Sequence, residues 1–136
     1  AAIDVAGAGG TSWAAVEHYR ALEAGDALRA RLGQTFWDWG IPTAASVLEV
    51  VSATELPVIA SGGVRTGLDV AKCLALGASL AGLALPVLKA AVRGPEAVAE
   101  LLRAVVEELR AAVFLVGYRS VAELAKTRGL KVPGRG

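Results

Sequence analysis

Three short runs of residues, apolar except for Asp4 in the first, alternate along the chain with longer amphipathic stretches. Continuous apolar runs predict strands that are buried on both faces, and they span residues 2–6, 56–60 and 80–85. Each run ends at a glycine, serine or proline, and a segment with apolar residues three or four positions apart follows each one. Strands that alternate with helices in this way predict an α/β fold of parallel βα units with right-handed crossovers.

Cap and breaker residues define the expected helix ends. Thr11 and Ser12 are N-cap candidates for the first helix, Thr43 for a later one, and Thr66 or Gly67 opens the helix after the second strand. Pro95 is typical of a helix start. The expected helices span residues 13–24, 27–32, 44–53, 67–76, 86–91 and 95–116, with a last short helix after the capping box at 120–123.

The length and composition favour one domain rather than two. The chain has 136 residues, of which 54% are hydrophobic, and it contains no methionine. Three strands alone would leave two apolar sheet edges exposed. We therefore expect a piece of a larger protein, with residues 1–128 forming the C-terminal part of a single domain and residues 129–136 forming a loose tail.

Charge and cysteine content exclude several classes of function. The 14 Lys and Arg residues nearly balance the 13 Asp and Glu residues, which argues against a basic nucleic-acid surface or a polybasic membrane anchor. No run approaches the ~20 apolar residues of a transmembrane helix. Cys73 and His18 are the only residues of their types, which excludes a disulfide framework and a cysteine-rich zinc site. We expect a cytoplasmic protein.

The strongest chemical motif follows the second apolar run. Gly62 and Gly63 lie between the strand and the helix, and Arg65 follows them. Glycine lets the backbone approach an anion closely, a helix start presents free N–H groups, and arginine adds a charge-assisted bond to phosphate. A tight βα turn that needs glycine for geometry alone is the alternative. A second strand end with small residues, at Ala84 and Leu85, favours the phosphate site.

The two strand ends together indicate a particular architecture. In eight-stranded parallel barrels, the loops after the last two strands often bind a phosphate with the help of a short extra helix. Residues 86–91 can form such a helix. The apolar runs are therefore expected to be strands six to eight of a TIM (β/α)₈ barrel, followed by terminal helices.

Four separated segments resemble one family, in the right order. Residues 61–78, SGGVRTGLDVAKCLALGA, are similar to the FMN phosphate segment of barrel flavoenzymes. Residues 4–13, DVAGAGGTSW, then distinguish among those enzymes, with support from residues 39–43 and 107–117. Together they resemble the C-terminal part of the FMN-dependent type 2 isopentenyl-diphosphate delta-isomerases, from residue 2 to about residue 124.

The resemblance implies an activity and a set of cofactors. It implies isomerisation of isopentenyl diphosphate to dimethylallyl diphosphate with reduced FMN, with NADPH as reductant and Mg²⁺ on the substrate diphosphate. It also implies a homo-oligomer, a tetramer or octamer, and a missing N-terminal part of the barrel that carries the metal ligands. No catalytic or metal-ligating side chain is expected here, and the isolated chain is expected to be inactive. The implied FMN contacts are Thr11, Gly63, Val64, Arg65, Ala84 and Leu85.

Three alternatives remain open at this point. One is another FMN barrel enzyme, of the α-hydroxy-acid oxidase or glutamate synthase type; the oxidases have a histidine before the phosphate loop, where this chain has Ile59 and Ala60. Another is a non-catalytic barrel fragment with an assembly role. The third is a nucleotide dehydrogenase whose catalytic cysteine lies elsewhere.

Several conspicuous residues have structural interpretations. His18 is expected on the surface or half-buried on its helix, and Cys73 is expected in the core among small apolar residues. Trp37 and Trp39 either line the substrate side or pack their loop. Asp4 is expected to be a buried charge that needs partners, with a structural role favoured over a catalytic one. Some members of the family have serine where this chain has Ala6, so Ala6 is not included in the site.

Overall fold

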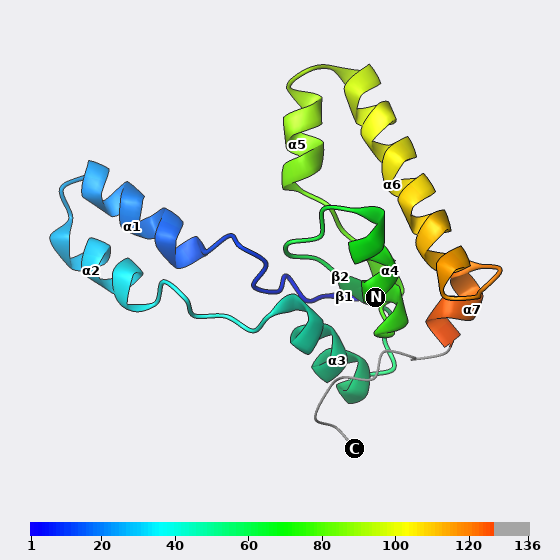
Figure 1. The fold of residues 1–136 in the computed structure, drawn as a ribbon. Helices are drawn as coiled ribbons and strands as arrows, with labels where there is room; N and C mark the ends of the chain where they lie inside the picture. The colour runs from blue at the N-terminus through cyan, green and yellow to red at the C-terminus, as the bar shows by residue number, and fades with distance from the viewer. Residues whose placement is uncertain (127–136) are drawn as a thin grey trace.

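A three-stranded parallel sheet with the order β1-β2-β3 forms the centre of the computed structural model, which describes residues 1–126 (Figure 1). The strands are β1 (Ile3–Asp4), β2 (Val58–Ala60) and β3 (Leu80–Ala81). Ile3 pairs with Val58, and Ile59 pairs with Leu80. The expected parallel order is therefore confirmed, although each strand is shorter than its apolar run. The predicted loose tail at residues 129–136 lies outside the described residues.

Seven helices connect and follow these strands within the described residues. Their bounds are α1 (Trp13–Glu23), α2 (Ala27–Thr35), α3 (Thr43–Ala53), α4 (Gly67–Ala75), α5 (Leu85–Ala91), α6 (Pro95–Leu115) and α7 (Val121–Lys126). None of them is long and apolar enough to span a membrane. α1 and α2 form a hairpin that extends away from the sheet, and α5 and α6 form a second hairpin on the other side (Figure 1).

Three of the predicted element boundaries that differ from the structure have a clear local reason. The third strand ends at Ala81 rather than residue 85, because the chain leaves the sheet at Gly82 and turns into α5 at Leu85. α2 continues three residues beyond its predicted end, with Asp26 capping it through Arg29 N–H. Thr43 is the first residue of α3 rather than its N-cap, because Pro42 occupies the cap position without a side-chain hydrogen bond.

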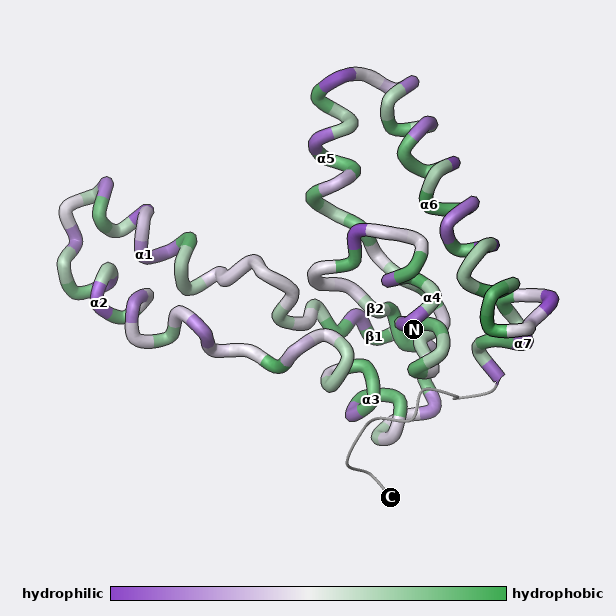
Figure 2. The backbone as a smooth tube through the Cα atoms, in the orientation of Figure 1, coloured by the Kyte–Doolittle hydropathy of each residue, from purple (hydrophilic) through white to green (hydrophobic). Residues whose placement is uncertain are grey.

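The core lies on both sides of α4. On the sheet side, buried residues of α3, β2 and α4 pack together, including Val47, Ala60 and Cys73. On the outer side, α4 packs against α6 and α7 through residues such as Leu74 and Val113. Figure 2 shows the apolar positions of α4 and α6 in green, alternating with polar positions along α6. α4 therefore connects the strand ends rigidly to the C-terminal helices.

Candidate functional site

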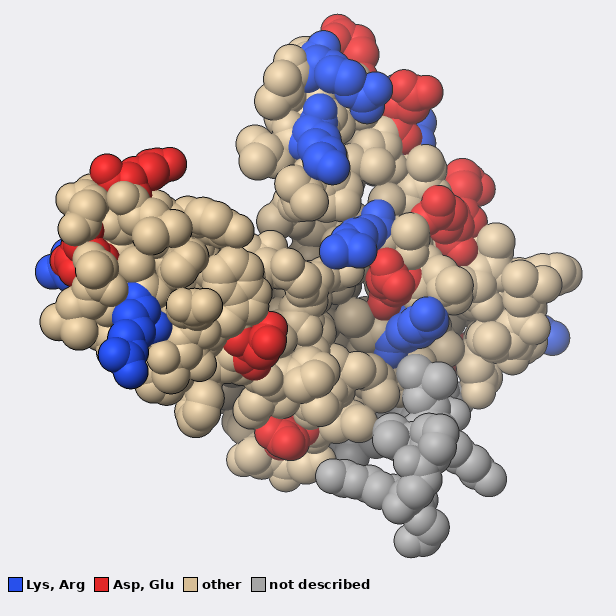
Figure 3. Space-filling model, turned by 60° about the vertical axis from the view of Figure 1, so that its left-hand side comes forward, with Lys and Arg blue, Asp and Glu red and all other residues tan. Residues whose placement is uncertain are grey.

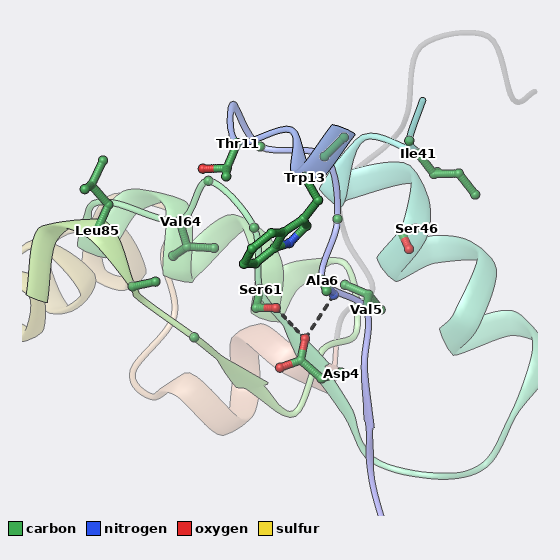
Figure 4. Close-up of a pocket in the computed structure, with 18 of the residues that line it drawn as sticks. Asp4, Val5, Ala6, Thr11, Trp13, Ile41, Ser46, Ser61, Val64 and Leu85 are labelled. Atoms are coloured by element: carbon green, nitrogen blue, oxygen red, sulfur yellow. Dashed lines mark hydrogen bonds between the residues drawn. The ribbon is translucent and has the colours of Figure 1, made fainter. Parts of the chain in front are cut away.

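A cavity lies at the carboxyl ends of the strands, where ligands of parallel α/β folds usually bind. Its volume is about 930 Å³, within the range of small-molecule sites. Segments 4–9, 61–65 and 82–86 line it, so both strand ends singled out from the sequence face one space (Figure 4). All six expected cofactor contacts lie along this cavity: Thr11, Gly63, Val64, Arg65, Ala84 and Leu85. Their contacts with FMN stay a prediction.

Two glycine-rich loops meet backbone to backbone at this cavity. A Cβ atom on Gly9 would overlap the peptide between Gly62 and Gly63, and one on Gly63 would lie 2.6 Å from the Gly9 carbonyl oxygen. Gly62 and Gly63 also have φ values of +100° and +75°, which side chains rarely adopt. The close approach therefore needs glycine on both loops, and it leaves backbone rather than side chain at the cavity wall.

Most N–H groups at the start of α4 already have acceptors, whereas several N–H groups of the cavity loops are free within the described residues. Arg65 and Thr66 N–H both donate to Asp69 Oδ2 over 3.1 Å, and Gly67 N–H donates to Glu108 Oε2 over 2.6 Å. Asp69 N–H donates to Thr66 Oγ1. Of the first three N–H groups of α4, only that of Leu68 makes no hydrogen bond within residues 1–126, and Leu68 does not line the cavity. The expectation of free donors at this helix start is therefore confirmed for that one group only. Several N–H groups of the cavity segments make no hydrogen bond to any part of the chain that the structure describes, among them those of Gly63, Val64, Ala84 and Leu85.

Arg65 adds a positive charge at the edge of the same cavity. Its guanidinium group lies 3.4 Å from the Gly9 carbonyl oxygen, and the side chain is exposed. On the face drawn in Figure 3, cationic and anionic side chains are interspersed rather than gathered by sign. A cationic side chain beside free N–H groups provides hydrogen-bond donors of the kind that bind a phosphate.

Asp4 and Ser61 form a polar pair at the base of the cavity (Figure 4). Ser61 Oγ donates to Asp4 Oδ1, and Ala6 N–H donates to the same oxygen over 3.0 Å. Asp4 is exposed, so the expectation of a buried charge was wrong, whereas the expected partners are present. Ser61 was missed from the sequence, although it directly precedes the glycines at a strand end.

Thr43 joins α3 to the glycine loop. Its hydroxyl donates to the Gly62 carbonyl oxygen over 2.6 Å in a partly buried bond. The sequence suggested a helix cap at this position, because threonine is a common N-cap residue. The bond instead ties the glycine loop to the first residue of α3.

Aromatic residues divide between the cavity and a separate cluster. Trp13 and Trp39 line the cavity and are 77% and 83% exposed. Trp37 instead packs edge-to-face on His18 and Tyr19. Of the two roles weighed for this loop, cavity lining therefore applies to Trp39 and packing applies to Trp37.

The histidine and the cysteine both lie outside the cavity. His18 is half-buried, as predicted, and its Nδ1 lies 2.6 Å from the Ala30 carbonyl oxygen. Cys73 is buried in the core, as predicted. Burial and the charge of Asp69 raise the pKa of the Cys73 thiol, which therefore stays protonated. Within residues 1–126, no group of three His, Cys, Asp or Glu side chains could hold a metal ion.

Curated relatives with the same name align with most of this chain. The isopentenyl-diphosphate delta-isomerase of Thermococcus kodakarensis is 58% identical over 126 residues, which are 92% of this chain and 33% of the relative. The relatives with this name from Pyrococcus furiosus and Methanothermobacter thermautotrophicus are 56% and 54% identical over 126 residues. These findings confirm the resemblance to the isomerases. The chain spans about a third of the length of these relatives.

Solved structures of flavin enzymes and one family model also match this chain. A mandelate oxidase mutant with a monooxide FMN adduct is 27% identical, with a TM-score of 0.61 over 92% of this chain and 40% of the oxidase. A mutant flavocytochrome b2 with benzoylformate is 30% identical, with a TM-score of 0.59 over 72% of this chain and 29% of its own. The model of the FMN-dependent dehydrogenases matches residues 36–130. Because that match covers more than half of the chain, this protein belongs to the FMN-dependent dehydrogenase family.

Proposed function

We propose that this chain forms the FMN-phosphate-binding end of an isopentenyl-diphosphate isomerase. The observation that carries the proposal is the convergence of Gly63–Arg65 and Ala84–Leu85 on one cavity, together with relatives of that name at 54–58% identity. The reaction would convert isopentenyl diphosphate to dimethylallyl diphosphate.

The residues of the cavity fit the phosphate of FMN. The N–H groups of Gly63, Val64, Ala84 and Leu85 would donate to the phosphate oxygens, and Arg65 would add a charge-assisted bond. Thr11 would donate its hydroxyl near the flavin. Bound reduced FMN supplies an acid/base group for moving a proton to and from the allylic system. The protein's own contribution is to orient the cofactor and exclude water, with Trp13 and Trp39 along the cavity.

Several further features belong to the same proposal. The three strands would be strands six to eight of a TIM barrel, and residues 1–128 would belong to its single domain. NADPH and Mg²⁺ are implied by the resemblance alone, and no residue of this chain is assigned to bind them. The complete enzyme would be a cytoplasmic homo-oligomer, a tetramer or octamer.

An oxidase of the mandelate oxidase type is not favoured. The curated isomerases share 54–58% identity with this chain, against 27% for the mandelate oxidase structure. The histidine of such oxidases has no counterpart here, because His18 packs against α2 through Ala30 rather than lining the cavity.

A chimera tests the proposal directly. This chain would replace the matching third of the Thermococcus kodakarensis relative, and formation of dimethylallyl diphosphate would be measured with reduced FMN. We expect isomerisation by the chimera and none by the chain alone. A folded chimera that binds FMN but does not isomerise would contradict the assigned activity.

Arg65→Ala in the chimera tests the phosphate site separately. Loss of one charge-assisted bond weakens FMN binding by about 1.5–3 kcal/mol, roughly 10- to 150-fold. Arg103→Ala removes the same charge from α6, outside this cavity, and should leave FMN affinity unchanged. Equal affinities for Arg65→Ala and the parent would remove Arg65 from the site.

A further inference from the structure

Glu108 lies on α6, outside the cavity, yet its side chain bonds to the residue at which α4 begins. Its Oε2 accepts a hydrogen bond of 2.6 Å from Gly67 N–H. Gly67 is buried, and a Cβ atom there would lie 2.2 Å from the Val105 carbonyl oxygen and 2.4 Å from the Leu109 backbone nitrogen. The start of α4 therefore lies directly against the backbone of α6, and Glu108 supplies a hydrogen bond that joins the two.

α6 contacts both of the helices that follow the two cavity loops. The loop Gly63–Val64 leads into α4, whereas Ala84–Leu85 begins α5. α5 and α6 form a hairpin (Figure 1), which turns at Gly94. α6 therefore connects the two groups of cavity N–H donors, to one by this short turn and to the other by the bond between Glu108 and Gly67.

We propose that Glu108 is a positioning residue for the phosphate site, which keeps the N–H groups of Gly63–Val64 at a fixed separation from those of Ala84–Leu85. The inference rests on the proposed function, because it needs the FMN phosphate between these two loops. All the donors must lie within hydrogen-bond distance of the phosphate oxygens at the same time, so a shift of one loop weakens several bonds together. Without Glu108, the buried Gly67 N–H must find water instead, which favours a start of α4 that has moved away from α6.

The charge of Glu108 would act in the opposite direction to its positioning effect. A negative charge repels a phosphate, so removal of the charge alone would strengthen FMN binding, whereas loss of the position of α4 would weaken it. Glu108→Gln removes the charge but keeps an oxygen that can accept from Gly67 N–H. Glu108→Asp keeps the charge but shortens the side chain by a methylene group, so the carboxylate no longer reaches as far. The two variants therefore separate the charge from the hydrogen bond.

FMN and riboflavin, which lacks the phosphate, test the inference on the full 136-residue chain. Flavin fluorescence measures both affinities, and the parent should bind FMN more tightly than riboflavin. Glu108→Ala should weaken FMN binding about tenfold, the effect of one hydrogen bond to a charged group, and leave riboflavin binding unchanged. Glu108→Asp should show the same selective loss, and Glu108→Gln should bind FMN within about threefold of the parent. Glu107→Ala is the matched control, because Glu107 pairs with Arg110 at the surface of the same helix, and it should change neither affinity.

Failure of this inference is distinguishable from failure of the proposed function. Unchanged or tighter FMN binding by Glu108→Ala would overturn the inference alone, and so would an equal loss of affinity for both flavins. A loss in Glu108→Gln as large as that in Glu108→Ala would also overturn it, because the hydrogen bond would then not be what matters. A parent that binds the two flavins equally, or binds neither, would overturn the phosphate site as well, since its proposed N–H donors and Arg65 all belong to this chain.

Discussion

At the scale of single residues, short polar side chains hold the cavity in shape. Thr43 Oγ1 donates to the Gly62 carbonyl oxygen, and Ser12 Oγ donates over 2.5 Å to the carbonyl oxygen of Trp37. Both bonds are partly buried and link segments that are distant in sequence. They tie α3 to the glycine loop and the start of α1 to the loop after α2.

Thr43→Val should destabilise the fold, because it leaves the Gly62 carbonyl oxygen without its donor while keeping the side-chain shape. The expected loss is about 1–3 kcal/mol in the free energy of unfolding, measured by denaturant titration. Thr35→Val is the matched control, because the Thr35 hydroxyl donates to Arg31 within an exposed helical turn. It should cost less than about 0.5 kcal/mol. Equal losses for the two variants would contradict the role of Thr43.

The residues of the site were only partly predictable from the sequence. The adjacent glycines Gly62 and Gly63 were recognisable, because a strand that runs into adjacent glycines is a strong local pattern. Thr43 was not, because threonine before a helix fits a cap equally well and its acceptor lies 19 residues away. The pairing of Asp4 with Ser61 depends on strand register across 57 residues. That register could not be predicted from a single sequence.

At the scale of elements, hydrogen bonds between residues close in sequence determine where α4 begins. Thr66 Oγ1 accepts from Asp69 N–H, and Asp69 accepts from Thr66 N–H, forming a capping box. Burial on its own would raise the pKa of the Asp69 carboxyl, but the Arg65 and Thr66 hydrogen bonds and the charge of Lys72 outweigh it and lower that pKa below 3.8. The helix start was predictable because these contacts lie within five residues of one another.

Asp69→Asn should lower stability at neutral pH and have less effect in acid. A carboxyl with a lowered pKa stabilises the folded state above its unfolded pKa, and this stabilisation is lost as the pH falls through the folded value. We expect a loss of about 1 kcal/mol at pH 7, shrinking as the pH falls below 3.8. Denaturant titrations across pH measure it, with Asp38→Asn on an exposed loop as control. A loss independent of pH would contradict the ionic origin.

Element boundaries were less predictable where tertiary structure decides them. The apolar run 80–85 predicted a longer strand, yet only Leu80 and Ala81 pair with β2. Beyond Ala81 the residues line the cavity and begin α5. Their apolar character fits a buried strand and a cavity wall equally well, so the pattern alone did not distinguish between them.

At the scale of the whole molecule, the exposed surface is unusually large. The chain exposes 9534 Å², whereas a folded monomer of this mass exposes about 6,600 Å². The difference, roughly 2,900 Å² on this chain alone, is well above the about 800 Å² per partner of a standard interface. Large apolar side chains contribute to it on separate elements, including Trp13, Leu80, Val92 and Phe114. The parallel strand order was predictable from the alternation of elements, and so were the open edges of the sheet.

These open edges lead to a prediction about association. β1 and β3 each have one neighbouring strand within the described residues, and exposed apolar edges pair with other chains. We expect the purified chain to associate with itself, or with the part of its relatives that it does not span when both are present, and the apparent mass in light scattering should rise with concentration. Adding the remaining two thirds of the Thermococcus kodakarensis relative should replace self-association with a defined complex. A monodisperse monomer with cooperative unfolding and no such complex would show that the sheet edges are protected in another way.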